Sequence, residues 1–170
     1  MNEEAVARTT PRLVVLGWGN DARGDDGLGP LLLARIAALD LPHVTTIEDF
    51  QLQIEHAMDL ETADLALFLD ASVAAPAPFG FTETGPRDDA SHSSHALSPE
   101  AVLEVFARVL GREPPPAFVL AMRGEGFELG AGLGATAAEG LEAAWAFVRP
   151  LIATPDAEVW RKAAATSARR

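Results

Sequence analysis

Short apolar runs that stop abruptly at glycine or polar residues constrain the fold of this chain more than any other feature. The first run, Leu-Val-Val-Leu at residues 13–16, ends at the turn residues Gly-Trp-Gly-Asn of 17–20. An apolar run between turn signals is typical of a strand that is buried on both faces. Helical spacing of apolar residues follows at 28–39, with Pro30 suited to the first turn. The chain therefore opens with the strand–loop–helix unit of an α/β protein.

The same alternation continues along the chain. Further strands are predicted at 44–47, 63–69, 79–83 and 118–122, and further helices at 54–60, 98–110 and 135–152. The link between the third and fourth strands is too short for a parallel crossover, so the fourth strand should run antiparallel. The order predicts a single-domain, three-layer α/β fold. Its five-stranded, mostly parallel twisted sheet has one antiparallel strand and helices on both faces.

We assign residues 1–170 to one domain, because nothing outside the loops is large enough to fold alone. The ordered core is expected at about 11–153, with flexible N-terminal and C-terminal tails. The last twelve residues, which carry Arg161, Lys162, Arg169 and Arg170, are expected to fray.

Composition excludes several classes of protein. A hydrophobic fraction of 48% is typical of a globular chain, and a formal charge of −12 argues against nucleic acid as a partner. The absence of cysteine excludes disulfides and thiolate metal sites, and the single lysine, Lys162, excludes a lysine-dependent phosphate loop. No apolar run approaches the ~20 residues of a membrane span, and the acidic start does not resemble a signal peptide. We therefore expect a cytoplasmic monomer with no membrane partner.

Carboxylates follow the ends of the first three predicted strands. Asp25 and Asp26 lie in the loop after the first strand, Asp49 ends the second, and Asp70 ends the third. If the strand order begins 2-1-3, the first and third strands are neighbours about 4.8 Å apart. Ligands of such sheets bind beyond the carboxyl ends, where the strand order reverses. Asp26 and Asp70 are therefore expected to share one crevice.

His95 is expected at the same edge. The loop before the helix at 98–110 has to return to the carboxyl ends of the strands, so it brings His95 close to Asp26 and Asp70. Two carboxylates and one imidazole suit a borderline divalent ion such as nickel, zinc or iron(II). Simpler explanations stay open: Asp25 could be a helix-capping acid, and His95 could be an ordinary exposed histidine. His92 and His95 also form a rival histidine pair.

A dinucleotide site is an alternative. The segment Gly-Trp-Gly-Asn-Asp-Ala at 17–22 fits a relaxed dinucleotide fingerprint, and Asp49 could hold a ribose. However, Asp21, Asp25 and Asp26 crowd the position of the pyrophosphate, and only Arg23 offsets their charge.

The segment Leu-Gly-Trp-Gly-Asn-Asp-Ala-Arg-Gly-Asp-Asp-Gly-Leu-Gly at 16–29 resembles the opening motif of the hydrogenase maturation endopeptidases. These proteases remove the C-terminal extension of the [NiFe]-hydrogenase large subunit. Leu-Asp-Ala at 69–71, Ser-His-Ala-Leu-Ser-Pro at 94–99 and Phe-Glu-Leu-Gly at 127–130 support the resemblance, which covers about residues 12–152. The stretch 49–56 is more similar to the proteases that serve soluble, NAD-reducing hydrogenases.

The resemblance implies an activity and a set of site residues. Asp26, Asp70 and His95 would be the catalytic and metal-binding residues, although some relatives have glutamate in place of Asp26. The partner would be a [NiFe]-hydrogenase large-subunit precursor that supplies the nickel, with no organic cofactor. Asn20, Asp25 and Asp49 are the candidate substrate-binding residues. The alternative from another class is a non-catalytic nickel-binding maturation chaperone with the same ligands.

Overall fold

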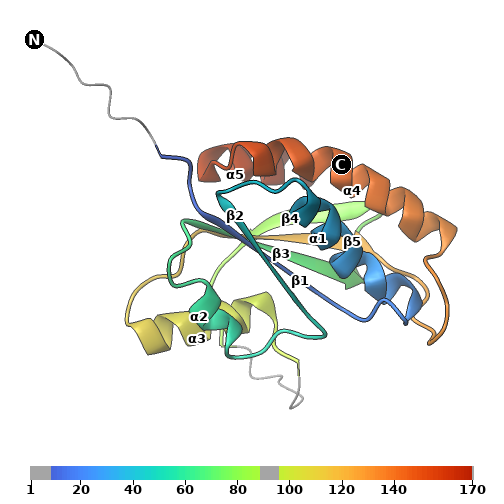
Figure 1. The fold of residues 1–170 in the computed structure, drawn as a ribbon, viewed down its shortest axis with the longest axis horizontal. Coiled ribbons are helices and arrows are strands. Elements are labelled where there is room, and N and C mark those ends of the chain that lie inside the picture. The colour runs from blue at the N-terminus through green and yellow to red at the C-terminus, as the bar shows by residue number, and fades with distance from the viewer. Residues whose placement is uncertain (1–8, 89–95, 170) are drawn as a thin grey trace, which may run out of the picture.

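The computed structural model describes residues 9–88 and 96–169 and contains a five-stranded sheet between two layers of helices (Figure 1). The strands lie in the order β2-β1-β3-β5-β4. β1 is parallel to β2 and β3, β3 is parallel to β5, and β4 is antiparallel to β5. The predicted α/β fold, the order beginning 2-1-3 and the antiparallel fourth strand are confirmed. The strands are β1 (Leu13–Trp18), β2 (Val44–Asp49), β3 (Leu65–Ser72), β4 (Phe79–Thr84) and β5 (Ala117–Arg123).

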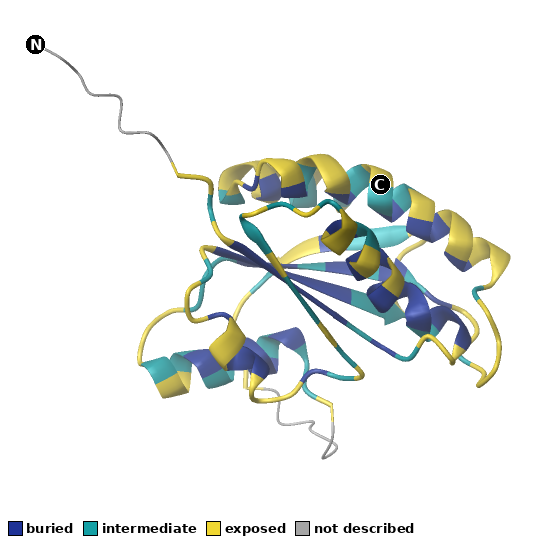
Figure 2. Cartoon of the chain, in the orientation of Figure 1, coloured by how far each residue is buried: buried dark blue, intermediate teal, exposed yellow. Residues whose placement is uncertain are grey.

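Helices cover both faces of the sheet, which explains why its central strands are continuously apolar. Leu13 and Val15 of β1 belong to the core beneath α1, α4 and α5, whereas Val14 and Leu16 belong to the core beneath α2 and α3. Alternate residues of a strand point to opposite faces, so a central strand here needs apolar side chains at every position. Figure 2 shows the buried residues along these strands and on the inner sides of the helices. The helices are α1 (Leu28–Ala38), α2 (His56–Asp59), α3 (Pro99–Leu110), α4 (Ala135–Ala153) and α5 (Ala157–Ser167), and a short 3-10 helix η1 (Gly24–Gly27) precedes α1.

Helix α3 begins where the sequence predicts. The Ser98 hydroxyl accepts a hydrogen bond from the Ala101 N–H at 3.1 Å, and Pro99 occupies the first helical position. Gly111 ends the helix with a φ of 64°, a left-handed conformation that glycine adopts without strain. These signals fix where α3 begins in the chain. Glu100 in its first turn accepts a hydrogen bond from the Thr84 hydroxyl at 2.6 Å and is close enough to Asp70 to raise its pKa.

The C-terminal segment is not a frayed tail, so that expectation is wrong for residues 157–167. Asp156 caps α5 by accepting hydrogen bonds from the N–H groups of Glu158 and Val159. Trp160 is fully buried, and its ring packs edge-on against Phe81 and Phe118. Burial of a tryptophan side chain is worth several kcal/mol, on the order of 3 to 5 when it is removed. The sequence signal for α5 is the capping Asp156 followed by Trp160. The basic residues of this segment led to the expectation of a frayed tail instead.

The N-terminal tail expected to be flexible falls mainly on residues 1–8, which lie outside the described residues. Over the ranges that are described, none of the helices has the length and apolar character needed to cross a bilayer.

Candidate functional site

The carboxyl edge of the sheet brings two of the predicted acids together. Asp26 lies in η1, directly after the loop that leaves β1, and Asp70 lies near the end of the adjacent strand β3. The Asp26 carboxylate is close enough to raise the pKa of Asp70. Asp49 ends β2 at the same edge, in register with Trp18 of β1. The sequence therefore placed Asp26, Asp49 and Asp70 on the correct side of the sheet.

The surroundings of Asp70 raise the pKa of its carboxyl group. Burial raises its pKa to about 6, and the negative charges of Asp26 and Glu100 contribute to the rise. A hydrogen bond from the Ala71 N–H opposes the shift without cancelling it. A carboxyl group with this pKa is mostly ionised at neutral pH but still takes up a proton readily, which suits general acid–base chemistry.

Asp26 closes the turn that follows β1. Its Oδ2 accepts a hydrogen bond from the Asn20 N–H at 2.7 Å, and the Asn20 side chain accepts one from the Ala22 N–H at 2.9 Å. Gly19 has a φ of 138°, and a Cβ there would overlap the carbonyl oxygen of Asp26. Asp26 thus already occupies the Asn20 amide, at the turn where a dinucleotide would place its pyrophosphate. This arrangement disfavours the dinucleotide alternative.

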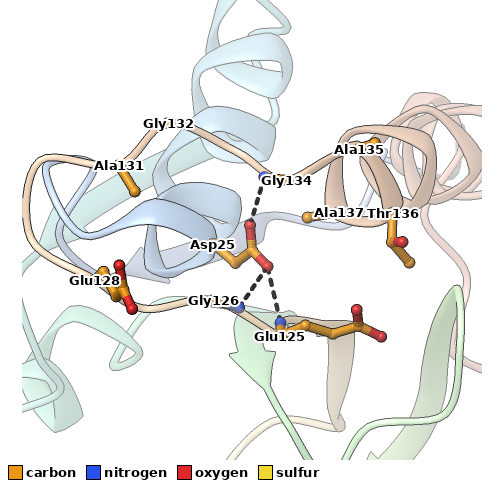
Figure 3. Close-up of a pocket in the computed structure, with 10 residues that line it drawn as sticks. All are labelled: Asp25, Glu125, Gly126, Glu128, Ala131, Gly132, Gly134, Ala135, Thr136 and Ala137. Atoms are coloured by element: carbon orange, nitrogen blue, oxygen red, sulfur yellow. Dashed lines mark hydrogen bonds between the residues drawn. The ribbon is translucent and has the colours of Figure 1, made fainter.

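Asp25 lies next to Asp26 in the sequence but faces a different part of the molecule. Its Oδ2 accepts hydrogen bonds from the N–H groups of Glu125 and Gly126 at 2.8 and 3.1 Å, and its Oδ1 accepts one from Gly134 at 2.9 Å (Figure 3). The side chain is 3% exposed and lines a pocket of about 290 Å³. Burial alone would raise the pKa of Asp25, but the three N–H donors outweigh it and lower the pKa.

These bonds give Asp25 a structural role across the chain. Gly134 is the N-cap residue of α4, so Asp25 binds the start of α4 and makes no capping bond to α1, the helix that follows it. Backbone bonds reinforce the attachment: the Asp25 N–H donates to Gly126, and the Gly24 N–H donates to Ala131. The predicted contact of Asp25 with substrate stays a prediction.

His56 is a residue of the site region that sequence reasoning missed. It is buried, its Nδ1 accepts a hydrogen bond from the Gln53 N–H at 2.8 Å, and its Nε2 lies 3.3 Å from Oδ2 of Asp49. Oδ1 of Asp49 accepts the Phe50 N–H at 2.7 Å. His56 therefore orients Asp49, which lines a second pocket of about 330 Å³ beside the 74% exposed Phe50. A lone histidine after Glu55 carried no sequence signal for this contact.

His95 and the rival His92 lie outside the described residues, so the third predicted ligand has no described position. Within residues 9–88 and 96–169, no three potential metal-binding side chains form a cluster. The pair of Asp26 and Asp70 is thus the described part of the predicted site. Two carboxylates are hard oxygen ligands that leave most positions of a divalent ion open.

No protein-family model matches the chain, and no curated protein matches it by sequence. Solved structures do match. A [NiFe] hydrogenase maturation protease, HycI, from Thermococcus kodakarensis has a TM-score of 0.66 at 21% identity, over 86% of this chain and 95% of its own. The hydrogenase maturating endopeptidase HybD from E. coli has a TM-score of 0.63 at 22% identity, over 85% and 94%. A hydrogenase 2 maturation peptidase from a Thaumarchaeota archaeon has a TM-score of 0.60 at 21% identity, over 84% and 99%. The chain therefore has the fold of the hydrogenase maturation proteases over nearly the full length of these structures.

Proposed function

We propose that this protein is a processing endopeptidase that removes the C-terminal extension of a [NiFe]-hydrogenase large-subunit precursor. The observation that carries the proposal is the pair of Asp26 and Asp70 at the carboxyl ends of adjacent parallel strands. The opening motif supplies Asp26, and the solved structures that share the fold are described as hydrogenase maturation proteases.

Asp70 is the residue best suited to activate water for attack on the scissile carbonyl. Its raised pKa makes it a stronger base than an ordinary carboxylate, and it is still largely ionised at pH 7. After attack, the same group can return the proton to the leaving amine. Asn20 and Asp49 flank the acids at this edge and are proposed to contact the precursor.

Nickel belongs to the substrate in this proposal. Asp26, Asp70 and His95 would form an incomplete ligand set, which would bind a free ion weakly but could complete the coordination of an ion already held by the precursor. Only a precursor that already contains nickel would then be recognised and cleaved. No organic cofactor is required. A chain without cysteine also fits the reducing cytoplasm, and we propose that the protein acts there as a monomer.

The test is the intact mass of a large-subunit precursor after incubation with this protein, with and without nickel loading. A precursor of a soluble, NAD-reducing hydrogenase is the first to try, given the similarity at 49–56. Loss of a C-terminal peptide only from the nickel-loaded sample is the expected result. Loss from both samples would overturn the role of nickel in recognition. Intact precursor in both samples would overturn the peptidase proposal and favour the nickel-binding chaperone.

A further inference from the structure

We infer that a groove running from Asp70 across β5 and β4 holds the first residues after the scissile bond, as an extended peptide with small side chains. This inference rests on the proposed function and adds the path of the substrate to it.

The sheet register aligns the floor of the groove. Asp70 of β3 pairs with Ala121 of β5, and Ala121 pairs with Gly80 of β4. Residues paired across strands point to the same face of the sheet. The side chains in this row therefore become smaller from Asp70 to Ala121 to Gly80. Ala121 and Gly80 are only half-buried. The row is therefore partly open to solvent, and the small side chain of Ala121 leaves room for the backbone of another chain to approach beside Asp70.

The neighbouring rows are taller and form the walls. Val119 pairs with Thr82 on one side of the floor. On the other side lie Ser72 and the loop that contains Pro76. A Cβ at position 80 would lie 3.0 Å from Cγ of Pro76, so Pro76 packs directly against Gly80 and leaves no room for a larger residue beneath that wall. The enclosed space is about 330 Å³ and ends beside Ser167 of α5. Asp70 is its only charged lining group among the described residues.

The direction of the groove identifies its occupant. On the β1 side of Asp70 lies Asp26, where the metal-bearing body of the precursor would have to sit. The groove leaves Asp70 on the opposite side, toward β4 at the edge of the sheet. Two strand spacings separate Asp70 from Gly80, about 10 Å, which an extended chain covers with about three residues. The groove thus fits the start of a short extension better than a folded body.

The absence of cysteine from the chain allows a direct test on the full-length protein. Thr82→Cys places a single thiol on the exposed wall of the groove, and Ala138→Cys places one on the exposed side of α4 as a control. The rate of modification by a thiol-reactive reagent is measured with and without a synthetic peptide of the precursor's C-terminal extension. With the peptide at ten times its dissociation constant, modification of Thr82→Cys is expected to slow about tenfold, and that of Ala138→Cys to stay unchanged.

A blocking variant gives a second readout on the intact precursor. Ala121→Leu fills the floor and is expected to raise KM about tenfold with little change in kcat, whereas Ala138→Leu changes neither. Circular dichroism and the midpoint of thermal unfolding check that each variant is folded.

The two measurements separate the groove from the activity. If the wild type cleaves the precursor but the peptide does not protect Thr82→Cys, the groove is overturned and the peptidase stands. The same conclusion follows if the wild type cleaves and a folded Ala121→Leu has an unchanged KM. Protection without cleavage would keep the groove and overturn the peptidase. Absence of both protection and cleavage would overturn both.

Discussion

Asp25 and Asp70 are two acids withdrawn from water near the same end of the sheet, yet the protein moves their pKa values in opposite directions. Burial is the largest influence on both groups and favours the neutral carboxyl in each. At Asp25 three backbone N–H groups outweigh burial and keep the group charged. At Asp70 a single N–H opposes burial, and two negative neighbours add to it. The difference separates an acid that holds the fold together from an acid that is available for chemistry.

The secondary structure around each acid explains the contrast. Asp25 faces the loop between β5 and α4, where N–H groups such as those of Glu125 and Gly134 have no ladder partner and are free to bind a carboxylate. Asp70 lies in a strand between β1 and β5, whose backbone groups are largely used by the sheet. The backbone N–H groups near a carboxylate in a central strand are already bonded to the neighbouring strands, so few of them can donate to the carboxylate.

Replacing Asp70 should have the largest effect, because the proposed function makes this residue the base in precursor cleavage. Asp70→Asn keeps the size of the side chain and its ability to accept the Ala71 N–H, but removes the base. The rate of precursor cleavage should fall about 10²- to 10⁴-fold. Asp59→Asn, an exposed acid on α2, is the matched control and should cleave at the wild-type rate. Wild-type cleavage by Asp70→Asn would remove Asp70 from the mechanism.

The next largest effect is on stability at Asp25. Asp25→Ala leaves three N–H groups without their acceptor, so the free energy of unfolding in urea should fall by about 3 kcal/mol or more. Hydrogen exchange should speed up most at the amides of Glu125, Gly126 and Gly134. A uniform change in exchange across the sheet would show that these bonds do not act locally.

The lowered pKa of Asp25 predicts that the folded protein loses stability in acid. Its pKa is lowered in the folded state, so its stabilisation is present above the unfolded value of 3.8 and is lost as the pH falls through the folded pKa.

Asp70 should show the opposite dependence on pH. Its folded pKa of about 6 lies above the ordinary 3.8, so ionised Asp70 destabilises the folded state at pH 8, by at most about 3 kcal/mol. Asp70→Asn should therefore be more stable than the wild type at pH 8. The advantage should shrink as the pH falls through 6 and vanish below 3.8, where the wild-type group is neutral in both states. Urea unfolding at a series of pH values measures this difference, and an advantage that persists at pH 3.5 would contradict it.

Regular, buried elements of this fold could be predicted from the sequence, whereas contacts made by loops could not. The strands were predictable because burial on both faces forces continuous apolar runs such as 13–16. The order beginning 2-1-3 was a condition of the site prediction, and the structure has that order. Helix α5 was missed because its core contact rests mainly on Trp160, among alanines and basic residues. The donors to Asp25 were not predictable, since backbone N–H groups about 100 residues away carry no residue identity. The contact of His56 with Asp49 depends on the path of an irregular loop, which no periodic pattern encodes.

The smallest predicted effect tests how tightly the loop is fitted around Asp25, using two glycines of that loop. A Cβ at Gly124 would lie 2.6 Å from Cζ of Phe127 and 3.2 Å from Cβ of Asp25, whereas at Gly134 it would lie 3.6 Å from the nearest oxygen of Asp25. Neither residue has a positive φ. Gly124→Ala should therefore cost about 1 kcal/mol of unfolding free energy, because the Phe127 ring must move. Gly134→Ala should stay within about 0.5 kcal/mol of the wild type. Equal costs in urea unfolding would mean that the loop relaxes around either methyl group, and that the hydrogen bonds to Asp25 alone fix its position.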